Sequence, residues 1–332
     1  METSLVTLAA FSTLLAHCPA NEKGQKQTFS DRKVATISKA SNKATAAATT
    51  KKDISCASFK IQATHEDSVL INKYLNDAAN YYSSLSSKYE EPKRREQLII
   101  HIARKLRGVP YVAKTLENDH EERLVINLRE LDCTTYVENV LAIYLCASKG
   151  STSIGEYIDN LRRIRYVDGD VSYATRQHYF TEWIEQNTKK GFVEERQSPN
   201  PPFSARQHVN INYMSTHVEA YPMLKNNKDL VKPIADMEKR LSGNTYMYIP
   251  KTSISNTNTF RSAIHDGDII AITTKKQGLD TSHIGIAVWH NDGLHMLNAS
   301  QIRKKVVEEP MTLYQYMQKH PSQTGIRIVR VK

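Results

Sequence analysis

The stretch that most constrains this chain runs from Leu131 to Leu145 and reads LDCTTYVENVLAIYL. Its apolar residues recur at three- and four-residue spacing, which is the period of a helix with a buried face. Asp132 is a favourable N-cap residue, and Gly150 stands where a glycine commonly ends a helix. The pattern therefore predicts a buried helix that begins at Cys133. At a helix start, free backbone N–H groups and the helix dipole favour a thiolate, the nucleophilic form of cysteine.

A buried structural cysteine is the competing interpretation of Cys133, because free cysteine often packs as a small hydrophobe. We expect that structural role for Cys146, in the same predicted helix. The other cysteines are Cys18 and Cys56, and no pair has C-x-x-C spacing. The sequence therefore predicts neither a zinc ribbon, nor a dithiol redox motif, nor a disulfide framework.

The composition and charge of the chain indicate which kinds of binding partner to expect. A chain of 332 residues with 40% hydrophobic residues can bury a sizeable core. The net charge is +10, and residues 1–60 hold half of this excess, with nine basic and four acidic residues. A basic surface favours approach to an anionic polymer, a cell wall or a membrane. No nucleic-acid-binding motif accompanies the charge, so we expect no nucleic-acid partner.

The N-terminus resembles a targeting segment. Leu5 to Cys18 form an apolar run of signal-peptide length, although no Lys or Arg precedes it, and a misplaced start codon is an alternative. Leu15 to Cys18 resemble a lipoprotein processing box, which would place a lipid anchor on Cys18. We therefore expect residues 1–20 to be a signal peptide or lipoprotein signal, and the protein to be exported, in the periplasm or anchored to a membrane. Residues 21–62, rich in Lys, Ser, Thr and Ala, are expected to be a low-complexity linker.

The rest of the chain divides at residue 108. Apolar spacing predicts helices over 69–82 and 98–106, within an N-terminal helical region of residues 63–107. Residues 108–332 are expected to form one domain, with a mostly helical insertion at about 156–250 that shapes a cleft. In that insertion residues 173–184 fit a packed helix and a substrate-binding wall equally well, and 223–241 is expected to be helical.

The C-terminal third reads as strands at 268–274, 283–289 and 294–299, with a hairpin loop at 290–293. This loop pairs Trp289 with Leu294, so that His283 lies diagonal to Asn298 on the same sheet face. Gly285, opposite Asn298, would leave room for the two side chains to meet.

Cysteine-dependent acyl transfer needs a thiolate, a histidine that moves the proton, and a polar group that orients the histidine. Cys133, His283 and Asn298 meet that requirement. His178 is the alternative base, and a hydrogen-bonded structural histidine is the alternative interpretation of His283.

Four motifs give the chain a resemblance to a known group. They are Gly108 to Tyr111, Asp132 to Thr134, Ser282 to Ala287, and Asn298 to Ser300. Their order resembles the NlpC superfamily of papain-like cysteine peptidases and amidases of bacterial cell walls. Residues 131–138, 176–180, 212–215 and 267–274 are similar to a branch thought to contain N-acetylmuramoyl-L-alanine amidases.

The resemblance implies a role for each matching residue. Cys133 would be the nucleophile, His283 the general base and acid, and Asn298 the orienting group. Tyr111 and the Cys133 backbone N–H would form the oxyanion hole. The implied substrate-binding residues are Asp132, Thr134, Arg176, His178, Tyr179, Asn212 and Ser282. Lys114 departs from the family, which usually has glycine there.

The implied fold is α+β and papain-like, with the cysteine helix packed on an antiparallel sheet, N-terminal helices and the mostly helical insertion. The implied reaction splits the amide between N-acetylmuramic acid and L-alanine in peptidoglycan fragments (muropeptides), with no metal or cofactor. Aromatic side chains of the insertion, including Tyr173, Trp183 and Tyr213, suit a sugar. The alternatives are a γ-D-glutamyl-diamino acid endopeptidase, in which Asp132 would hold a free amine, and a non-catalytic wall-binding protein.

Overall fold

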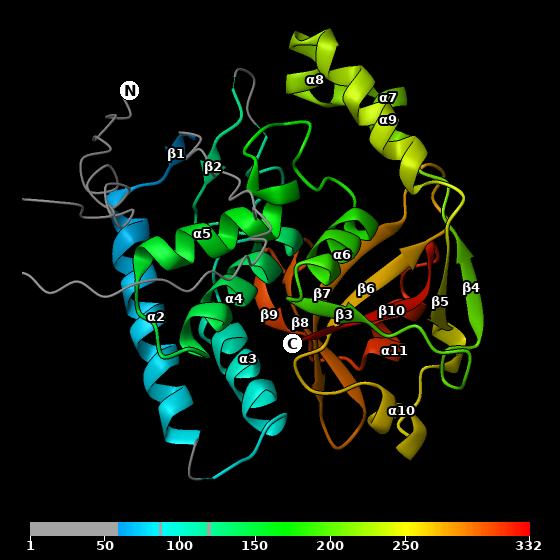
Figure 1. Ribbon diagram of the computed structural model, residues 1–332. Helices are drawn as coiled ribbons and strands as arrows, with labels where there is room; N and C mark the ends of the chain where they lie inside the picture. Colours follow the sequence, from blue (N-terminus) through cyan, green and yellow to red (C-terminus); the bar gives the residue numbers. More distant parts are fainter. Residues whose placement is uncertain (1–58, 86–87, 118–120) are drawn as a thin grey trace, which may run out of the picture.

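The computed structural model describes residues 59–85, 88–117 and 121–332 (Figure 1). The predicted signal segment, Cys18 and all but the end of the predicted linker lie outside these residues. Within the described ranges, no helix combines the length and apolar character needed to cross a membrane.

An antiparallel sheet of eight strands lies at the centre of the described part of the chain. Seven strands follow the order β4-β5-β10-β6-β7-β8-β9, and β3 also pairs with β10. Their bounds are β3 Val193–Glu195, β4 Ala205–His208, β5 Thr245–Pro250, β6 Ile269–Thr274, β7 Thr281–Trp289, β8 Leu294–Ser300, β9 Lys305–Glu308 and β10 Gln323–Val331. Separately, β1 (Ile61–Gln62) and β2 (Leu124–Val125) form a short parallel pair.

Helices cover both faces of this sheet (Figure 1). Helices α2 to α5 gather on one side, α10 and α11 pack on the other, and α7 to α9 form a small group at one end. The bounds are α2 His65–Leu85, α3 Lys93–Lys105, α4 Cys133–Ala147, α5 Ile154–Arg165, α6 Phe180–Lys189, α7 Tyr213–Thr216, α8 Pro222–Asn226, α9 Val231–Leu241, α10 Asn258–Ala263 and α11 Leu313–Gln318.

Strand β6 shows why the sheet is covered twice. Ile269 and Ala271 belong to the core under α2 to α5, whereas Ile270 and Ile272 belong to the core under α10 and α11. A strand buried on both faces needs a continuous apolar run rather than an alternating pattern. The sequence of β6 supplies that run.

Helix α4 begins at Cys133, as predicted, because a capping box fixes its start. The Asp132 carboxylate accepts hydrogen bonds from the backbone N–H and the hydroxyl of Thr135, both at 2.8 Å. The Thr135 hydroxyl in turn accepts from the Asp132 backbone N–H at 2.9 Å. Gly150, at φ +72°, follows the helix end at Ala147. The helix is buried from Thr135 to its last residue, so it forms the centre of the larger core.

The other predicted elements are only partly confirmed. Predicted helices 69–82 and 98–106 are α2 and α3, and the three predicted strands are β6, β7 and β8, with Trp289 paired to Leu294. Residues 173–184 do not form one helix, since α6 begins at Phe180. The helix expected over 223–241 is broken into α8 and α9 around Asn227. The predicted insertion also supplies β3, β4 and β5 to the sheet.

Gly285 lies at a close approach between β7 and β8. A Cβ there would lie 2.5 Å from Met296 Cγ and 2.7 Å from the Leu297 carbonyl oxygen. The glycine therefore allows β7 and β8 to approach closely.

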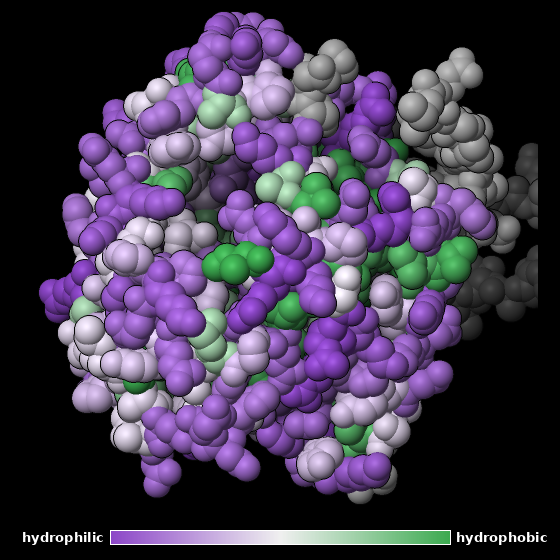
Figure 2. All heavy atoms as spheres, turned by 180° about the vertical axis from the view of Figure 1, so that it is seen from behind, coloured by the Kyte–Doolittle hydropathy of each residue, from purple (hydrophilic) through white to green (hydrophobic). Residues whose placement is uncertain are grey.

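The face seen from behind is largely hydrophilic, and its apolar side chains form small separate groups (Figure 2). Such scattered groups are usual for a protein surface and do not by themselves mark an interface.

Candidate active site

A cavity of about 370 Å³ opens at the first turn of α4. It lies between α4, the start of β7 and the loops before α6 and after β6. Eight of the residues singled out from the sequence line it, namely Asp132, Cys133, Thr134, Arg176, His178, Tyr179, Ser282 and His283. Segments 150 residues apart in the sequence thus converge on the predicted nucleophile.

His283 and Asn298 make the predicted contact. The distance from His283 Nε2 to Asn298 Oδ1 is 2.9 Å, and Asn298 is fully buried. An amide oxygen only accepts hydrogen bonds, so Nε2 carries the proton in the neutral ring and Nδ1 has the free lone pair. Burial lowers the pKa of His283, and the hydrogen bond that the ring donates to Asn298 opposes this shift. The imidazole is therefore neutral near neutral pH and can accept a proton at Nδ1.

Cys133 is half-buried, and its sulfur is held as a thiol in the resting protein. Burial, and then the Asp132 carboxylate, raise the pKa of the Cys133 thiol to about 12. Hydrogen bonds to the sulfur from the Ile284 backbone and from Thr134 act in the opposite direction. The expectation that the helix start alone favours a thiolate is therefore wrong, because the adjacent carboxylate and desolvation outweigh the helix N–H groups.

Cys146 has the structural role expected for it. It is fully buried, and the side-chain amide of Asn160 donates a hydrogen bond to its sulfur at 3.3 Å. Burial raises the pKa of this thiol to about 12 as well. The contrast between the two cysteines is therefore one of access: Cys133 lines the cavity and Cys146 does not.

Tyr111 lies beside the nucleophile position but outside the cavity lining. Burial, and then the proximity of Cys133 and Asp132, raise the pKa of its phenol to about 12. The phenol is therefore protonated and remains a hydrogen-bond donor, which is what an oxyanion hole requires.

Three of the predicted substrate-binding residues are already held by the protein. Arg176 is buried, and its guanidinium donates to the carboxylates of Glu117 and Glu122. His178 Nε2 lies 2.7 Å from the Tyr173 carbonyl oxygen, and burial lowers the pKa of its ring well below the usual value. The Tyr179 hydroxyl likewise donates to Glu238 Oε1 at 2.6 Å. These three sets of contacts shape the wall of the cavity.

Several residues expected at the site lie elsewhere. Asn212 is exposed and absent from the cavity lining, and its side chain abuts Gly278. Trp183 is fully buried and stacks on Phe180, so it is a core residue. Tyr213 stacks on His217, also outside the lining. The pattern of aromatic residues in the sequence therefore did not distinguish the aromatic side chains of the core from those that line the cavity.

Sequence reasoning also missed a buried ion pair in the wall of the cavity. Glu138 Oε2 and Arg165 Nε are 2.7 Å apart, and each side chain is 2% exposed. Arg165 also donates to the Val125 carbonyl oxygen at 2.6 Å. Both residues line the cavity. A glutamate on the buried face of a predicted apolar helix was the available signal.

Lys114 occupies a backbone conformation that favours glycine, with φ +61°. This explains physically why a glycine suits the position. The Lys114 side chain reaches the Ala220 carbonyl oxygen at 3.2 Å and lines the cavity together with Tyr221. A cationic side chain therefore stands at the cavity edge where a glycine would leave it open.

Comparisons with known proteins give a consistent result. The model of a family described as N-acetylmuramoyl-L-alanine amidase-like (AmiA-like) matches residues 101–326. A crystal structure of an N-acetylmuramoyl-L-alanine amidase from Bacteroides uniformis is 38% identical, with a TM-score of 0.66, and the match covers 71% of this chain and 98% of that one. A Bacteroides fragilis protein that carries the provisional name xylanase is 40% identical, with a TM-score of 0.64, over 69% of this chain and 98% of its own.

A Legionella pneumophila protein shares the fold at 23% identity and a TM-score of 0.56, over 80% of this chain and 96% of its own. No curated protein matches the chain. The fold and cavity define a mixed α/β protein in which a cysteine and a histidine line one cavity at the start of a central helix, with a buried asparagine hydrogen-bonded to the histidine. The chain belongs to the N-acetylmuramoyl-L-alanine amidase-like family.

Proposed function

We propose that this protein is a cysteine-dependent N-acetylmuramoyl-L-alanine amidase acting on peptidoglycan fragments. One observation carries the proposal: Cys133 and His283 line one cavity, and His283 is hydrogen-bonded to buried Asn298. The family and the amidase from Bacteroides uniformis support the choice of bond. We also propose that the fold is of the papain-like NlpC type, because a cysteine helix and a histidine strand are its defining parts.

The reaction begins with a neutral pair. His283 Nδ1 takes the Cys133 proton as the sulfur attacks the lactyl carbonyl carbon, and the carbonyl electrons move to oxygen. The Cys133 backbone N–H and the Tyr111 phenol stabilise that oxyanion. The C–N bond then breaks, the His283 proton passes to the departing amine of L-alanine, and a thioester remains. A water molecule, deprotonated by His283, hydrolyses the thioester and restores the thiol.

The choice of the amidase over the endopeptidase rests on the family, and Asp132 has a structural role that needs no substrate amine. An endopeptidase of the kind considered needs a carboxylate that holds the free amine of L-alanine. Asp132 Oδ1 already accepts two hydrogen bonds that fix the start of α4. The amidase makes no such demand, and needs room for a sugar beside the sulfur.

The remaining parts of the proposal concern organisation and location. We propose the division into a signal segment (1–20), a linker (21–62), a helical region (63–107) and a catalytic domain (108–332). We also propose export to the periplasm or a membrane surface, with Cys18 as a possible site of lipid attachment. Cell fractionation and mass spectrometry of the mature N-terminus test both points.

The experiment for the activity is mass spectrometry of products from a purified disaccharide-peptide. Release of an intact peptide that begins at L-alanine, together with a free disaccharide, is the expected result. A disaccharide that retains L-Ala-D-Glu would instead establish the endopeptidase reaction.

Cys133→Ala is the matched inactive control, and should yield no product while melting within a few degrees of the parent. Product from this variant would refute the cysteine mechanism. Retention of the wild-type protein on cell walls with no product released would favour a non-catalytic wall-binding protein.

A further inference from the structure

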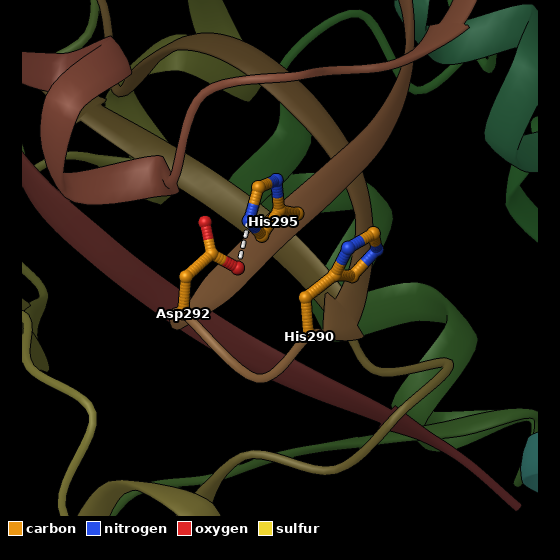
Figure 3. A group of neighbouring side chains, drawn as sticks. All are labelled: His290, Asp292 and His295. Atoms are coloured by element: carbon orange, nitrogen blue, oxygen red, sulfur yellow. Dashed lines mark hydrogen bonds and ion pairs between the residues drawn. The ribbon is translucent and has the colours of Figure 1, made fainter.

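A second group of reactive side chains lies at the far end of the β7–β8 hairpin, outside the cavity. His290 and Asp292 belong to the hairpin loop, and His295 lies on β8. One ligand atom from each of these residues lies within 4.8 Å of the other two. Figure 3 shows Asp292 and His295 joined by a contact, with one ring nitrogen of His290 turned toward them and the other turned away.

We propose that His290, Asp292 and His295 form a binding site for a divalent transition metal of the zinc type. Two imidazoles and one carboxylate are a donor set that suits such ions, and three protein ligands leave one position for water. The spacing is compact: the three residues fall within the six-residue run HNDGLH, and the hairpin turn itself brings them together.

The tautomer of His295 supports a cation at this place. His295 is 3% exposed, and its Nδ1 lies 2.9 Å from the Glu309 carbonyl oxygen. A carbonyl oxygen only accepts, so Nδ1 carries a proton and Nε2 of the neutral ring has a free lone pair. That nitrogen lies 3.0 Å from Asp292 Oδ1, another acceptor. Two acceptors in contact need a positive charge between them, either a proton or a metal ion.

His290 stacks on the His295 ring, with 4.2 Å between the ring centroids, and it makes an outer contact of the kind that metal-bound histidines make. Its Nε2 lies 2.7 Å from Glu308 Oε1, which leaves Nδ1 for a metal. A carboxylate behind one ring and a backbone carbonyl behind the other are the outer contacts that fix the tautomers of such ligands. Glu308 also pairs with Arg104 and Arg107, and these two cations line the same hollow as the three proposed ligands.

The consequence of binding is mechanical. The strands that meet at this loop are β7, which carries His283, and β8, which carries Asn298. A metal held by both sides of the turn would close the hairpin at the end opposite the cavity. The inference is independent of the proposed amidase reaction, because neither His290 nor His295 lines the cavity.

The test is calorimetric titration of the chelator-treated full chain with Zn²⁺ alone. It is performed in the Cys133→Ala background, so that the cavity thiol does not contribute. We expect one site that weakens at least about tenfold in both His290→Ala and Asp292→Asn. The matched control is His208→Ala, an exposed histidine on β4, which should leave the affinity unchanged. Equal affinity in all four proteins would overturn the proposal.

Two further readouts keep the result interpretable. Bound Co²⁺ should show visible absorption without a thiolate charge-transfer band, because the ligands are nitrogen and oxygen. A thiolate band would assign the metal to a cysteine and refute the site. Zn²⁺ should raise the melting temperature of the Cys133→Ala protein and leave that of its Asp292→Asn derivative unchanged. The absence of any binding would mean that a proton joins Asp292 to His295.

Discussion

The resting state of Cys133 is the most direct point at which this structure can be tested. Its thiol has a pKa of about 12 against an ordinary value of 9, so the thiolate fraction at neutral pH falls about 1000-fold. Since iodoacetamide reacts with the thiolate, alkylation of Cys133 should be slower than that of a free small-molecule thiol by a similar factor. The rate should keep rising with pH through pH 9.

The Asp132→Asn variant removes the negative charge beside the thiol and keeps the helix cap. Asparagine caps helices about as well as aspartate, so α4 should still begin at Cys133. The substitution removes the negative charge that raises the pKa of the thiol, after burial. Alkylation of Cys133 in this variant should therefore be faster than in the parent at every pH below the thiol pKa.

The assay is peptide mass spectrometry after timed alkylation, because it assigns the label to one cysteine among four. Cys146, which is buried outside the cavity, is the internal control and should stay unlabelled. A rate at Cys133 that is already at its plateau at pH 7 would refute the reasoning. It would mean that the resting protein holds a thiolate and imidazolium pair.

Three further residues of the cavity region, Asn298, Arg165 and Lys114, also give testable predictions. Asn298→Ala should reduce kcat by up to about 100-fold through looser orientation of His283. In the unmodified protein, the acid limb of the kcat/KM profile should lie below the ordinary histidine pKa, because burial lowers the pKa of His283 and only the neutral ring accepts a proton. Arg165→Met should lower the free energy of unfolding by about 3–5 kcal/mol in urea denaturation, because Glu138 is left buried and unpaired. Lys114→Gly should raise that free energy by up to about 1 kcal/mol, since φ +61° strains any residue with a Cβ.

The sequence predicted the parts of the fold that depend on local signals. Asp132 followed by an apolar helical period predicted where α4 starts, because a capping box and burial both act within a few positions. The four-residue loop after Trp289 defined the β7–β8 register, because loop length fixes which residues pair. The contact between His283 and Asn298 followed from that register.

What the sequence did not predict depends on distant contacts. Strand β10 lies between β5 and β6, and nothing near residues 323–331 reveals those partners. Trp183 and Tyr179 look alike in a pattern of aromatic residues, but one is in the core and the other lines the cavity. Arg176 looked available for substrate until Glu117 and Glu122 were found to hold it. Such partners lie more than 50 residues away in the chain.

The register between β7 and β8 determines whether His283 and Asn298 can meet. Side chains alternate between the faces of a sheet, so a slip of one residue would turn His283 away from Asn298. The close approach at Gly285, where a Cβ would meet Met296 and the Leu297 carbonyl, opposes such a slip because only glycine fits there. The 2.9 Å contact between the histidine and the asparagine therefore also rests on the backbone geometry at Gly285, two residues from His283, and not on the two side chains alone. Orientation of the proposed base is consequently a property of the whole hairpin.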